Sequence, residues 1–276
     1  MAWAQHGDIR LWYETFGDDR SDPLLLVNGL GSQCINFRDE WCERFVAAGF
    51  FVLRFDNRGL GLSGPDEPAA GGYTLEDMAA DGVAVLDAAG VERAHVLGVS
   101  LGGMVVQTMA IEHPDRLRSL TSVMSTTGDP DVGQSAPAAR EHLLRPPATS
   151  RDEYVESHVA GLRIWGSPGK VDEADAAEQA GRAYDRAFRP EGVAAQLQAV
   201  MRASSRTEGL REVELPTLVL HGSADTLIDP SGGRRTAEAV PGARFVEIEG
   251  MGHDYPRVFW DRWVALVAEH ALGPGG

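Results

Sequence analysis

The stretch that decides the fold reads Gly98-Val99-Ser100-Leu101-Gly102, between the apolar run Ala94–Leu97 and a helical pattern that begins at Leu101. Glycine two residues before and two residues after a serine, between a strand and a helix, is typical of a sharp turn that exposes the hydroxyl. The two flanking positions nearly touch in such a turn, so neither has room for a side chain. The next amide lies at a helix N-terminus, where N–H groups are free and the dipole favours an anion. The stretch therefore predicts a nucleophilic serine rather than a plain glycine turn.

Short apolar runs alternate with helical patterns on both sides of this turn. Strands are expected at Trp3–His6, Ile9–Phe16, Leu24–Asn28, Phe50–Asp56, Ala94–Val99, Leu117–Ser125, Thr217–His221 and Arg244–Glu249. Helices are expected at Phe37–Ala48, Leu75–Ala89, Leu101–His113, Gly232–Ala239 and Pro256–His270. Such alternation predicts an α/β fold, with a mostly parallel sheet flanked by helices.

The segment 129–206 interrupts the alternation. Its pattern is helical, and prolines punctuate it at Pro137, Pro146, Pro147, Pro168 and Pro190. A long strandless segment between two strands indicates a helical cap inserted in the sheet domain. We therefore expect one core made of residues 1–128 and 207–276, with the cap at 129–206.

Composition narrows the range of partners. The formal net charge of −16 disfavours binding to nucleic acid and to anionic membranes, which leaves a small-molecule substrate as the expected partner. No apolar run is long enough to span a bilayer, and no signal peptide is visible. Cys34 and Cys42 are not spaced as a metal or redox pair, so we expect two reduced thiols in a cytoplasmic protein. No metal or cofactor motif is present, and the sequence does not define the oligomeric state.

A serine nucleophile needs a base, and the base needs an acid that orients it. Of the eight histidines, His253 lies in the loop Gly250–Asp254, directly after the last expected strand. Asp225 follows the strand Thr217–His221, at the edge where parallel sheets build their sites. Asp129, at the end of the strand before the cap, is the alternative acid. Asp229, before a proline, is expected to cap a helix instead.

Two backbone N–H groups are needed to hold the oxyanion that forms during attack on a carbonyl. The amide of Leu101, directly after the serine, is the first candidate. The second is the amide of Leu30, in the loop Asn28-Gly29-Leu30-Gly31, where small residues let backbone approach a substrate closely.

Two apolar stripes in the expected cap are candidates for a substrate pocket. They consist of Tyr154, His158, Leu162 and Trp165, and of Val193, Leu197, Val200 and Met201. Helical spacing places each stripe on one face, which either packs on the sheet or lines a pocket. Trp165, large and at the end of its stripe, is the best single candidate for a substrate-binding residue. His158 is expected to line or to pack rather than to act as a second base.

The chain resembles the α/β-hydrolase family along its full length and, within it, actinobacterial esterases related to aclacinomycin methylesterase. The similar segments are Val27–Gly31, Arg54–Ser63, Gly98–Gly103, Pro216–Asp225 and Gly250–His253. The resemblance implies the triad Ser100, Asp225 and His253, with the amides of Leu30 and Leu101 as the oxyanion hole. Many relatives carry His-Gly where this chain has Asn28-Gly29, which alters the hydrogen bonding around that loop. Asp56 and Arg58, in a shared segment, are interpreted as a structural ion pair.

These residues together predict hydrolysis of a carboxylic ester through an acyl-enzyme, with a methyl ester or a lactone as candidate substrates. The same triad could serve a carbon–carbon hydrolase, a thioesterase or a perhydrolase. A ligand receptor with slow turnover is the alternative outside enzymes, because a fold alone does not define a function.

Overall fold

The computed structural model describes residues 1–64 and 72–273, and these form one eight-stranded sheet with helices on both faces. The strands are β1 (Ala2–His6), β2 (Ile9–Phe16), β3 (Asp22–Val27), β4 (Phe50–Phe55), β5 (Ala94–Val99), β6 (Leu117–Val123), β7 (Thr217–Gly222) and β8 (Arg244–Ile248). Their order in the sheet is β1-β2-β4-β3-β5-β6-β7-β8. The hairpin β1–β2 joins β4 in antiparallel fashion, and every pairing from β4 to β8 is parallel. The expected α/β class is confirmed.

Ten α-helices lie within the described residues. They are α1 (Asp39–Ala47), α2 (Leu75–Ala88), α3 (Leu101–Glu112), α4 (Pro137–Leu143), α5 (Arg151–Trp165), α6 (Glu173–Arg186), α7 (Pro190–Arg202), α8 (Thr207–Arg211), α9 (Ser231–Ala239) and α10 (Trp260–Leu272). Helix α2 begins at Leu75, as expected, because Thr74 and Asp77 form a reciprocal capping box there. The helix expected from Pro256 instead begins with a 3-10 turn, Arg257–Phe259, before α10.

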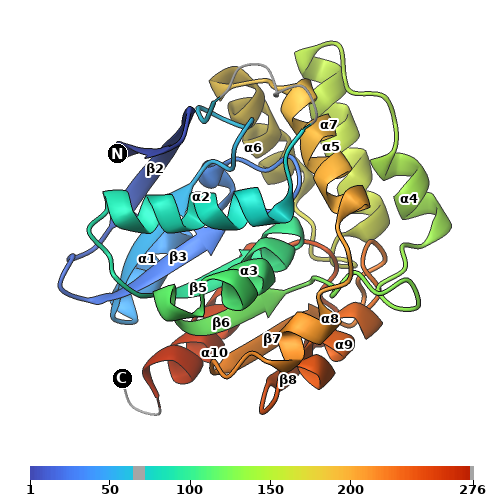
Figure 1. The fold of residues 1–276 in the computed structure, drawn as a ribbon. Coiled ribbons are helices and arrows are strands. Elements are labelled where there is room, and N and C mark those ends of the chain that lie inside the picture. The colour runs from blue at the N-terminus through green and yellow to red at the C-terminus, as the bar shows by residue number, and fades with distance from the viewer. Residues whose placement is uncertain (65–71, 274–276) are drawn as a thin grey trace.

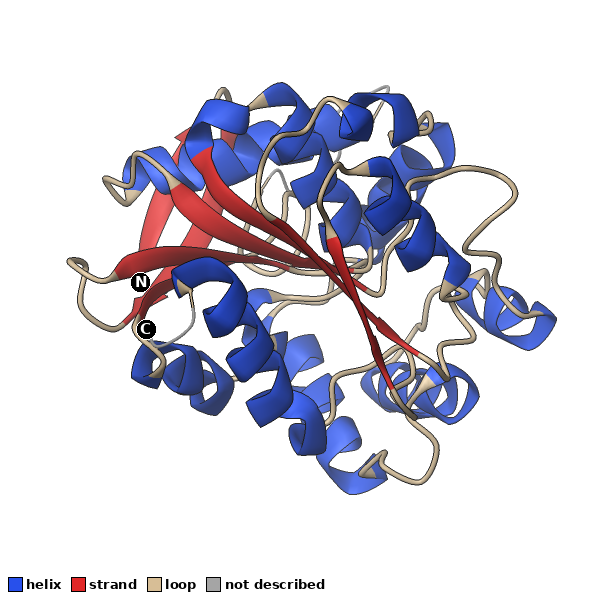
Figure 2. Cartoon of the chain, turned by 90° about the horizontal axis from the view of Figure 1, so that it is seen from below, coloured by secondary structure: helices blue, strands red, loops and turns tan. Residues whose placement is uncertain are grey.

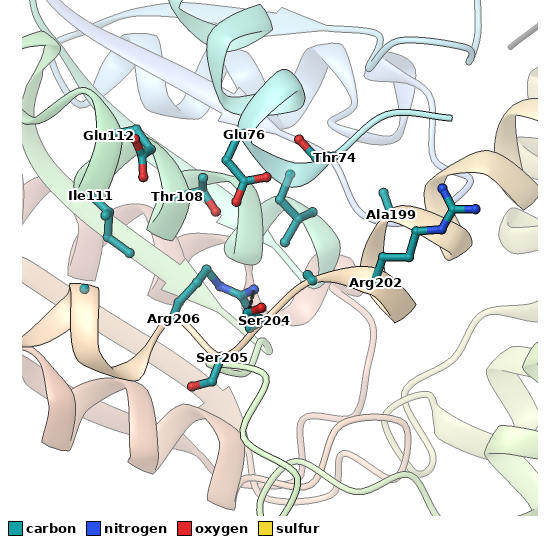
Figure 3. Close-up of a pocket in the computed structure, with 13 residues that line it drawn as sticks. Thr74, Glu76, Thr108, Ile111, Glu112, Ala199, Arg202, Ser204, Ser205 and Arg206 are labelled. Carbon is teal, nitrogen blue, oxygen red and sulfur yellow. Dashed lines mark hydrogen bonds between the residues drawn. The ribbon is translucent and has the colours of Figure 1, made fainter. Parts of the chain in front are cut away.

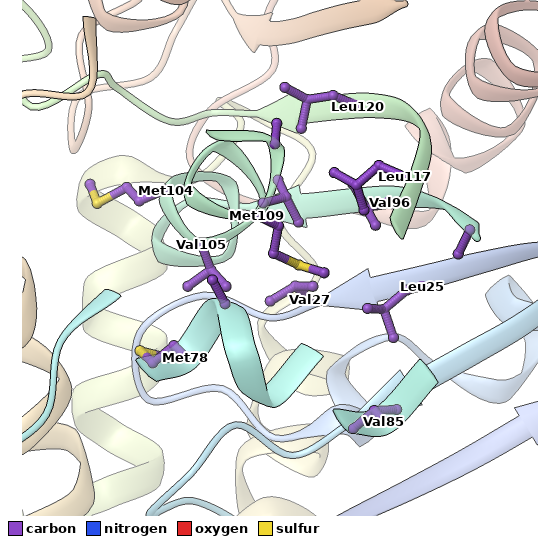
Figure 4. Packing of buried hydrophobic residues seen from close by; sticks show 14 of the residues in the cluster. Leu25, Val27, Met78, Val85, Val96, Met104, Val105, Met109, Leu117 and Leu120 are labelled. Atoms are coloured by element: carbon purple, nitrogen blue, oxygen red, sulfur yellow. The ribbon is translucent and has the colours of Figure 1, made fainter. Parts of the chain in front are cut away.

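Alternate residues of the central strands face opposite sides of the sheet, which explains why their sequences are apolar throughout. Leu25 and Val27 of β3 pack with α2 and α3, as the close-up of this cluster shows (Figure 4). Leu24 and Leu26 pack on the other side with α1 and α10. The view from below shows the twisted strands between these two helical layers (Figure 2). The inner strands β3 to β7 are thus almost entirely buried on both faces, and only their ends are available for a site.

Helices α4–α7 gather at the upper right of Figure 1, away from the two layers that cover the sheet. They lie between β6 and β7 in the chain, and the described part of the chain has no strand between 129 and 206. We call residues 129–206 the helical insert. One of its expected stripes is partly wrong, since Met201 is 75% exposed. The fully buried residues of α7 are smaller or polar: Gly192, Ala195, Gln196 and Ala199.

Candidate active site

The turn at Ser100 has the strained geometry that the glycines predict. Ser100 has φ +55°, which is unusual for a residue with a side chain. A Cβ on Gly98 would lie 2.0 Å from the carbonyl oxygen of Gly102, and one on Gly102 would lie 2.1 Å from that of Val27. Both positions therefore require glycine. The strained residue persists because β5 and α3 hold it from both sides.

The structure brings Ser100, His253 and Asp225 together from three separate loops. The Nε2 atom of His253 lies 2.9 Å from the hydroxyl of Ser100, and its Nδ1 lies 2.7 Å from the carboxylate of Asp225. Because an ionised carboxylate can only accept, Nδ1 carries the proton and Nε2 is free to accept from the serine. This is the hydrogen-bond geometry that proton abstraction from a serine requires.

Asp225 is almost fully buried, and its environment keeps it charged. One carboxylate oxygen accepts the N–H groups of Leu227 and Ile228, both at 2.9 Å. The other faces His253 and also lies 3.2 Å from Nε2 of the buried His221. Burial alone would raise the pKa of Asp225, but the two imidazoles and these hydrogen bonds hold it well below the usual range. His221 thus lies behind the site, in direct contact with Asp225.

Asp129, the alternative acid, has other partners. It accepts hydrogen bonds from Ser205, from Thr207 at 2.8 Å, and from Arg235. Burial would raise the pKa of Asp129, but these three donors hold it at about 2. The carboxylate thus ties the start of the helical insert to its end and to α9. Asp229 accepts the N–H of Ser231, the first residue of α9, but Pro230 occupies the N-cap position, so Asp229 lies one residue before the cap that was expected of it.

The loop after β3 passes directly over Ser100. A Cβ on Gly29 would lie 3.2 Å from Cβ of Ser100, so backbone occupies the space beside the serine. Two N–H groups of this loop already have acceptors. Ser32 donates to the carbonyl of Gly29 within the loop, and Gly31 donates to the side chain of Gln196 on α7 at 3.0 Å. No hydrogen bond among the described residues uses the N–H of Leu30 or of Leu101. Both expected donors are therefore available to a ligand.

The end of α5 holds the loop that carries His253. The carbonyl oxygen of Trp165 accepts the N–H of His253 at 2.6 Å. Ser167 donates its hydroxyl and its N–H to Asp254 at 2.5 and 3.0 Å, and its hydroxyl oxygen accepts the N–H of Gly252 at 2.9 Å. The helical insert is thus fastened to the loop on both sides of the imidazole.

The indole of Trp165 is half-buried and packs edge-to-face on His142, with ring centroids 5.3 Å apart. His158, two turns earlier on the same face of α5, is also half-buried, and burial lowers its pKa. The Trp165 ring thus packs on His142 and keeps part of its surface exposed, which is compatible with contact to a substrate.

The expected ion pair between Asp56 and Arg58 is wrong. Asp56 is fully buried and pairs with Arg186 of α6 at 2.8 Å, while Arg58 pairs with Asp81 of α2 at 2.5 Å. Asp56 lies directly after β4 and Arg58 lies in the turn that follows, so the two side chains meet partners from different helices. The pair Asp56–Arg186 is one more anchor of the helical insert.

A cavity of about 280 Å³ lies between α2, α3 and the connection from α7 to α8 (Figure 3). Arg206 lines it and donates to the side chain of Gln107 and the carbonyl of Thr126, at 3.1 and 2.9 Å. Burial lowers the pKa of Arg206 to about 10. None of the residues expected at the site lines this cavity, so it is not the predicted substrate pocket.

Among the residues that the structure describes, no group of three or more His, Cys, Asp or Glu side chains could hold a metal ion. Cys34 and Cys42 are free, buried thiols, and burial raises the pKa of Cys42 to about 12. Within 1–64 and 72–273, no helix is long and apolar enough to cross a membrane. The last residues of the expected core, 274–276, lie outside the described part.

Sequence reasoning missed the residues by which the helical insert contacts the site. Ser167 and Asp254 lie close to expected residues, but nothing in their spacing links them. Gln196 could have been noticed, because a polar residue among the small and apolar residues that α7 buries indicates a specific hydrogen bond.

Comparison with known proteins agrees with this architecture. Residues 22–255 match the family described as the alpha/beta hydrolase fold. The chain belongs to the α/β-hydrolase family. Within that family it is 33% identical to the rhodomycin D methylesterase DnrP of Streptomyces peucetius, with 95% of each chain covered. The resemblance to methylesterases of this kind is confirmed.

Solved structures give the same result for the fold. A hydrolase from Pseudomonas aeruginosa PA01 superposes with a TM-score of 0.78 at 28% identity, covering 99% of this chain and 98% of that one. The enol-lactonase from Burkholderia xenovorans LB400 superposes with a TM-score of 0.79 at 24% identity, covering 98% and 99%. The match includes the helical insert, because nearly the whole of both chains is covered.

Proposed function

We propose that the chain is a serine hydrolase that cleaves a carboxylic ester of a small, largely apolar molecule, with Ser100, His253 and Asp225 as its triad. The observation that carries this proposal is the continuous path from the Ser100 hydroxyl through both nitrogens of His253 to Asp225, at 2.9 and 2.7 Å. The similarity to a methylesterase over nearly the full chain supports a methyl ester as substrate. A lactone is an ester closed into a ring, so the same groups can open it.

In the first half of the reaction the Ser100 oxygen attacks the ester carbonyl while Nε2 of His253 takes its proton. The carbonyl oxygen gains the negative charge and is held by the N–H groups of Leu30 and Leu101. The imidazolium, stabilised by the charged Asp225, then protonates the leaving alcohol. The carbon–oxygen bond of the ester breaks, and an acyl group remains on Ser100.

In the second half a water molecule takes the place of the alcohol. His253 accepts one of its protons as the water oxygen attacks the acyl carbonyl, and the same two amides hold the new oxyanion. The serine oxygen leaves and regains its proton from His253. The free acid departs, and the enzyme returns to its starting protonation state.

We infer that residues 1–128 and 207–276 form the catalytic core and that the helical insert is its cap. The half-buried Trp165 at the end of α5 is the proposed substrate contact, since apolar side chains dominate small-molecule sites. The two buried free thiols suit a reducing compartment, so we place the protein in the cytoplasm.

A panel of chromogenic esters tests the proposal. We expect turnover of p-nitrophenyl and methyl esters. We also expect a fluorophosphonate to label Ser100, and this labelling should be slower when a substrate is present. Faster turnover of thioesters or of vinylogous diketones would favour the thioesterase or the carbon–carbon hydrolase. Tight binding of the panel with no turnover would favour a receptor.

A further inference from the structure

We propose that Gln196, on α7 of the helical insert, is a positioning residue for the oxyanion hole. Its side-chain oxygen holds the N–H of Gly31 and thereby keeps the neighbouring Leu30 amide directed at the space beside Ser100. The proposal rests on the proposed function, since it assigns a residue that supports the same two amides.

The first support is that α7 sits on the loop as a fixed element. A Cβ on Gly192 would lie 1.8 Å from the carbonyl oxygen of Gly59, so the helix backbone is in direct contact with the core. One residue later, the methyl groups of Val193 lie 3.6 Å from the position of a Cβ on Gly31. Gln196 follows on the same face of α7 and reaches Gly31 at 3.0 Å. A side chain on a helix held this closely can fix a flexible glycine loop.

The second support is the burial of Gln196. Its exposed fraction is 0%, and its Nε2 has no hydrogen-bond partner among the described residues. Because Gly31 offers a donor, the atom that faces it must be the oxygen Oε1. A buried donor without a partner destabilises a protein, and an apolar side chain would avoid that cost. The acceptor oxygen is therefore the chemical feature that distinguishes glutamine from an apolar residue at this place.

The third support is the hydrogen bonding of the loop itself. The N–H of Gly31 goes to Gln196 and the N–H of Ser32 goes to Gly29, which determines the orientation of both peptides. The N–H of Leu30 is left without an acceptor in the described chain. The Leu30 N–H belongs to the peptide whose carbonyl, that of Gly29, accepts the N–H of Ser32. Without Gln196, the next peptide, between Leu30 and Gly31, could rotate; the turn from Gly29 to Ser32 would then loosen, and the Leu30 N–H would lose its direction. Since the negative charge on the carbonyl oxygen exists only in the transition state, this loss should lower kcat rather than raise KM.

The variant Gln196→Met tests the proposal, because methionine has a similar length but no acceptor for Gly31. We expect kcat for a p-nitrophenyl ester to fall by about 10- to 100-fold, less than or equal to the loss of a whole oxyanion donor. KM should change by less than about threefold, because ground-state binding does not use the hole. Affinity for phenylboronic acid, which forms a tetrahedral anion on the serine, should fall in parallel with kcat.

Gln179→Met is the matched control. Gln179 is another buried glutamine of the helical insert, and its Nε2 donates to the carbonyl of Ile35 at 2.9 Å, further along the same connection. We expect this variant to lower the melting temperature without changing kcat or boronate affinity. A similar fall in kcat for both variants would mean that Gln196 contributes only to stability.

The concentration of active sites is measured by complete reaction with a fluorophosphonate, and kcat is calculated from that concentration. Unfolded protein therefore does not lower the measured kcat. If Gln196→Met does not fold, Gln196→Ala removes the same acceptor and is measured in its place. An unchanged boronate affinity, or a loss confined to KM, would overturn the proposal while leaving the esterase assignment intact. Wild-type activity that does not depend on Ser100 would instead overturn the proposed function.

Discussion

The backbone N–H of His253 donates to the carbonyl oxygen of Trp165 at 2.6 Å, which joins the loop of the proposed base to the end of α5. Next to this bond, a Cβ on Gly252 would lie 2.4 Å from the same carbonyl oxygen, so loop and helix end are in close contact. The helical insert therefore contributes to the position of the imidazole.

Ser167→Ala should show this contribution. The variant removes the hydroxyl that binds both Asp254 and Gly252, and we expect a loss of about 1–3 kcal/mol in stability with a several-fold lower kcat. Ser150→Ala is the matched control, because Ser150 caps the other end of α5. Loss of this cap should lower stability by about 1 kcal/mol without affecting the His253 loop. Urea unfolding and kcat are measured for both. Equal kcat values in the two variants would contradict the role of Ser167.

Ser100→Ala should abolish fluorophosphonate labelling and lower kcat by several orders of magnitude, as loss of a triad nucleophile does. Ser125→Ala is the control, since the Ser125 hydroxyl only donates to the carbonyl of Ser100 at 2.8 Å. That variant should keep its label. Mass spectrometry of the labelled peptide identifies the residue, and full esterase activity of Ser100→Ala would exclude it as nucleophile.

Asp225→Asn should lower kcat by about 10³–10⁴-fold, because an amide facing Nδ1 favours the tautomer that presents an N–H to Ser100. Asp129→Asn is the comparison, since Asp129 is also hydrogen-bonded but lies in a structural network with Thr207 and Arg235. We expect it to affect stability more than kcat. Kinetics that single out Asp129 as the essential acid would reverse the assignment.

Trp165→Ala should change the ratio of kcat/KM for short against bulky esters, by an amount equivalent to about 1–3 kcal/mol. The substitution keeps the backbone carbonyl that holds His253, so Ser100 should still react with the probe. A panel of esters that differ in acyl and alcohol size measures the ratio. The same selectivity in variant and wild type would mean that the indole only packs on His142.

The free energy of unfolding should decrease on acidification because of His95. This residue is 6% exposed, and its Nδ1 lies 2.8 Å from the hydroxyl of Ser119. Burial lowers the pKa of His95 to about 4. The unfolded chain therefore takes up the proton first, at about pH 6.5, and this contribution is lost as the pH falls from there to about 4. The loss should reach about 3 kcal/mol at most. Urea unfolding at several pH values should show a shallower dependence in His95→Asn, and an equal slope would contradict the prediction.

Much of the site followed from local rules in the sequence. The collision of any Cβ at Gly98 with the backbone of Gly102 depends only on the turn itself, so the motif predicts the turn wherever a strand and a helix flank it. Parallel strands end at one edge of a sheet, so residues directly after the strands, such as Asp225 and His253, were expected near Ser100. Strands β3, β4, β5 and β7 were visible as apolar runs because both of their faces are buried.

Other features depended on contacts between segments far apart in the chain. Asp225 and Asp129 both follow strands, so the sequence did not distinguish them as acids by position. In the folded protein α8 and α9 supply Thr207 and Arg235, which bind the carboxylate of Asp129. Likewise Asp56 paired with Arg186 rather than with Arg58, because the partner came from the helical insert.

The sequence by itself thus determined the parallel α/β core, the turn at Ser100 and the chain order of serine, acid and histidine. The tertiary structure alone decided how the helical insert meets them, through Gln196 at Gly31 and through Trp165 and Ser167 at the His253 loop. The reason is physical. A turn or a strand is specified by residues adjacent in sequence, whereas a helix shows only which face it buries, and its partners are decided by the packing of the whole molecule.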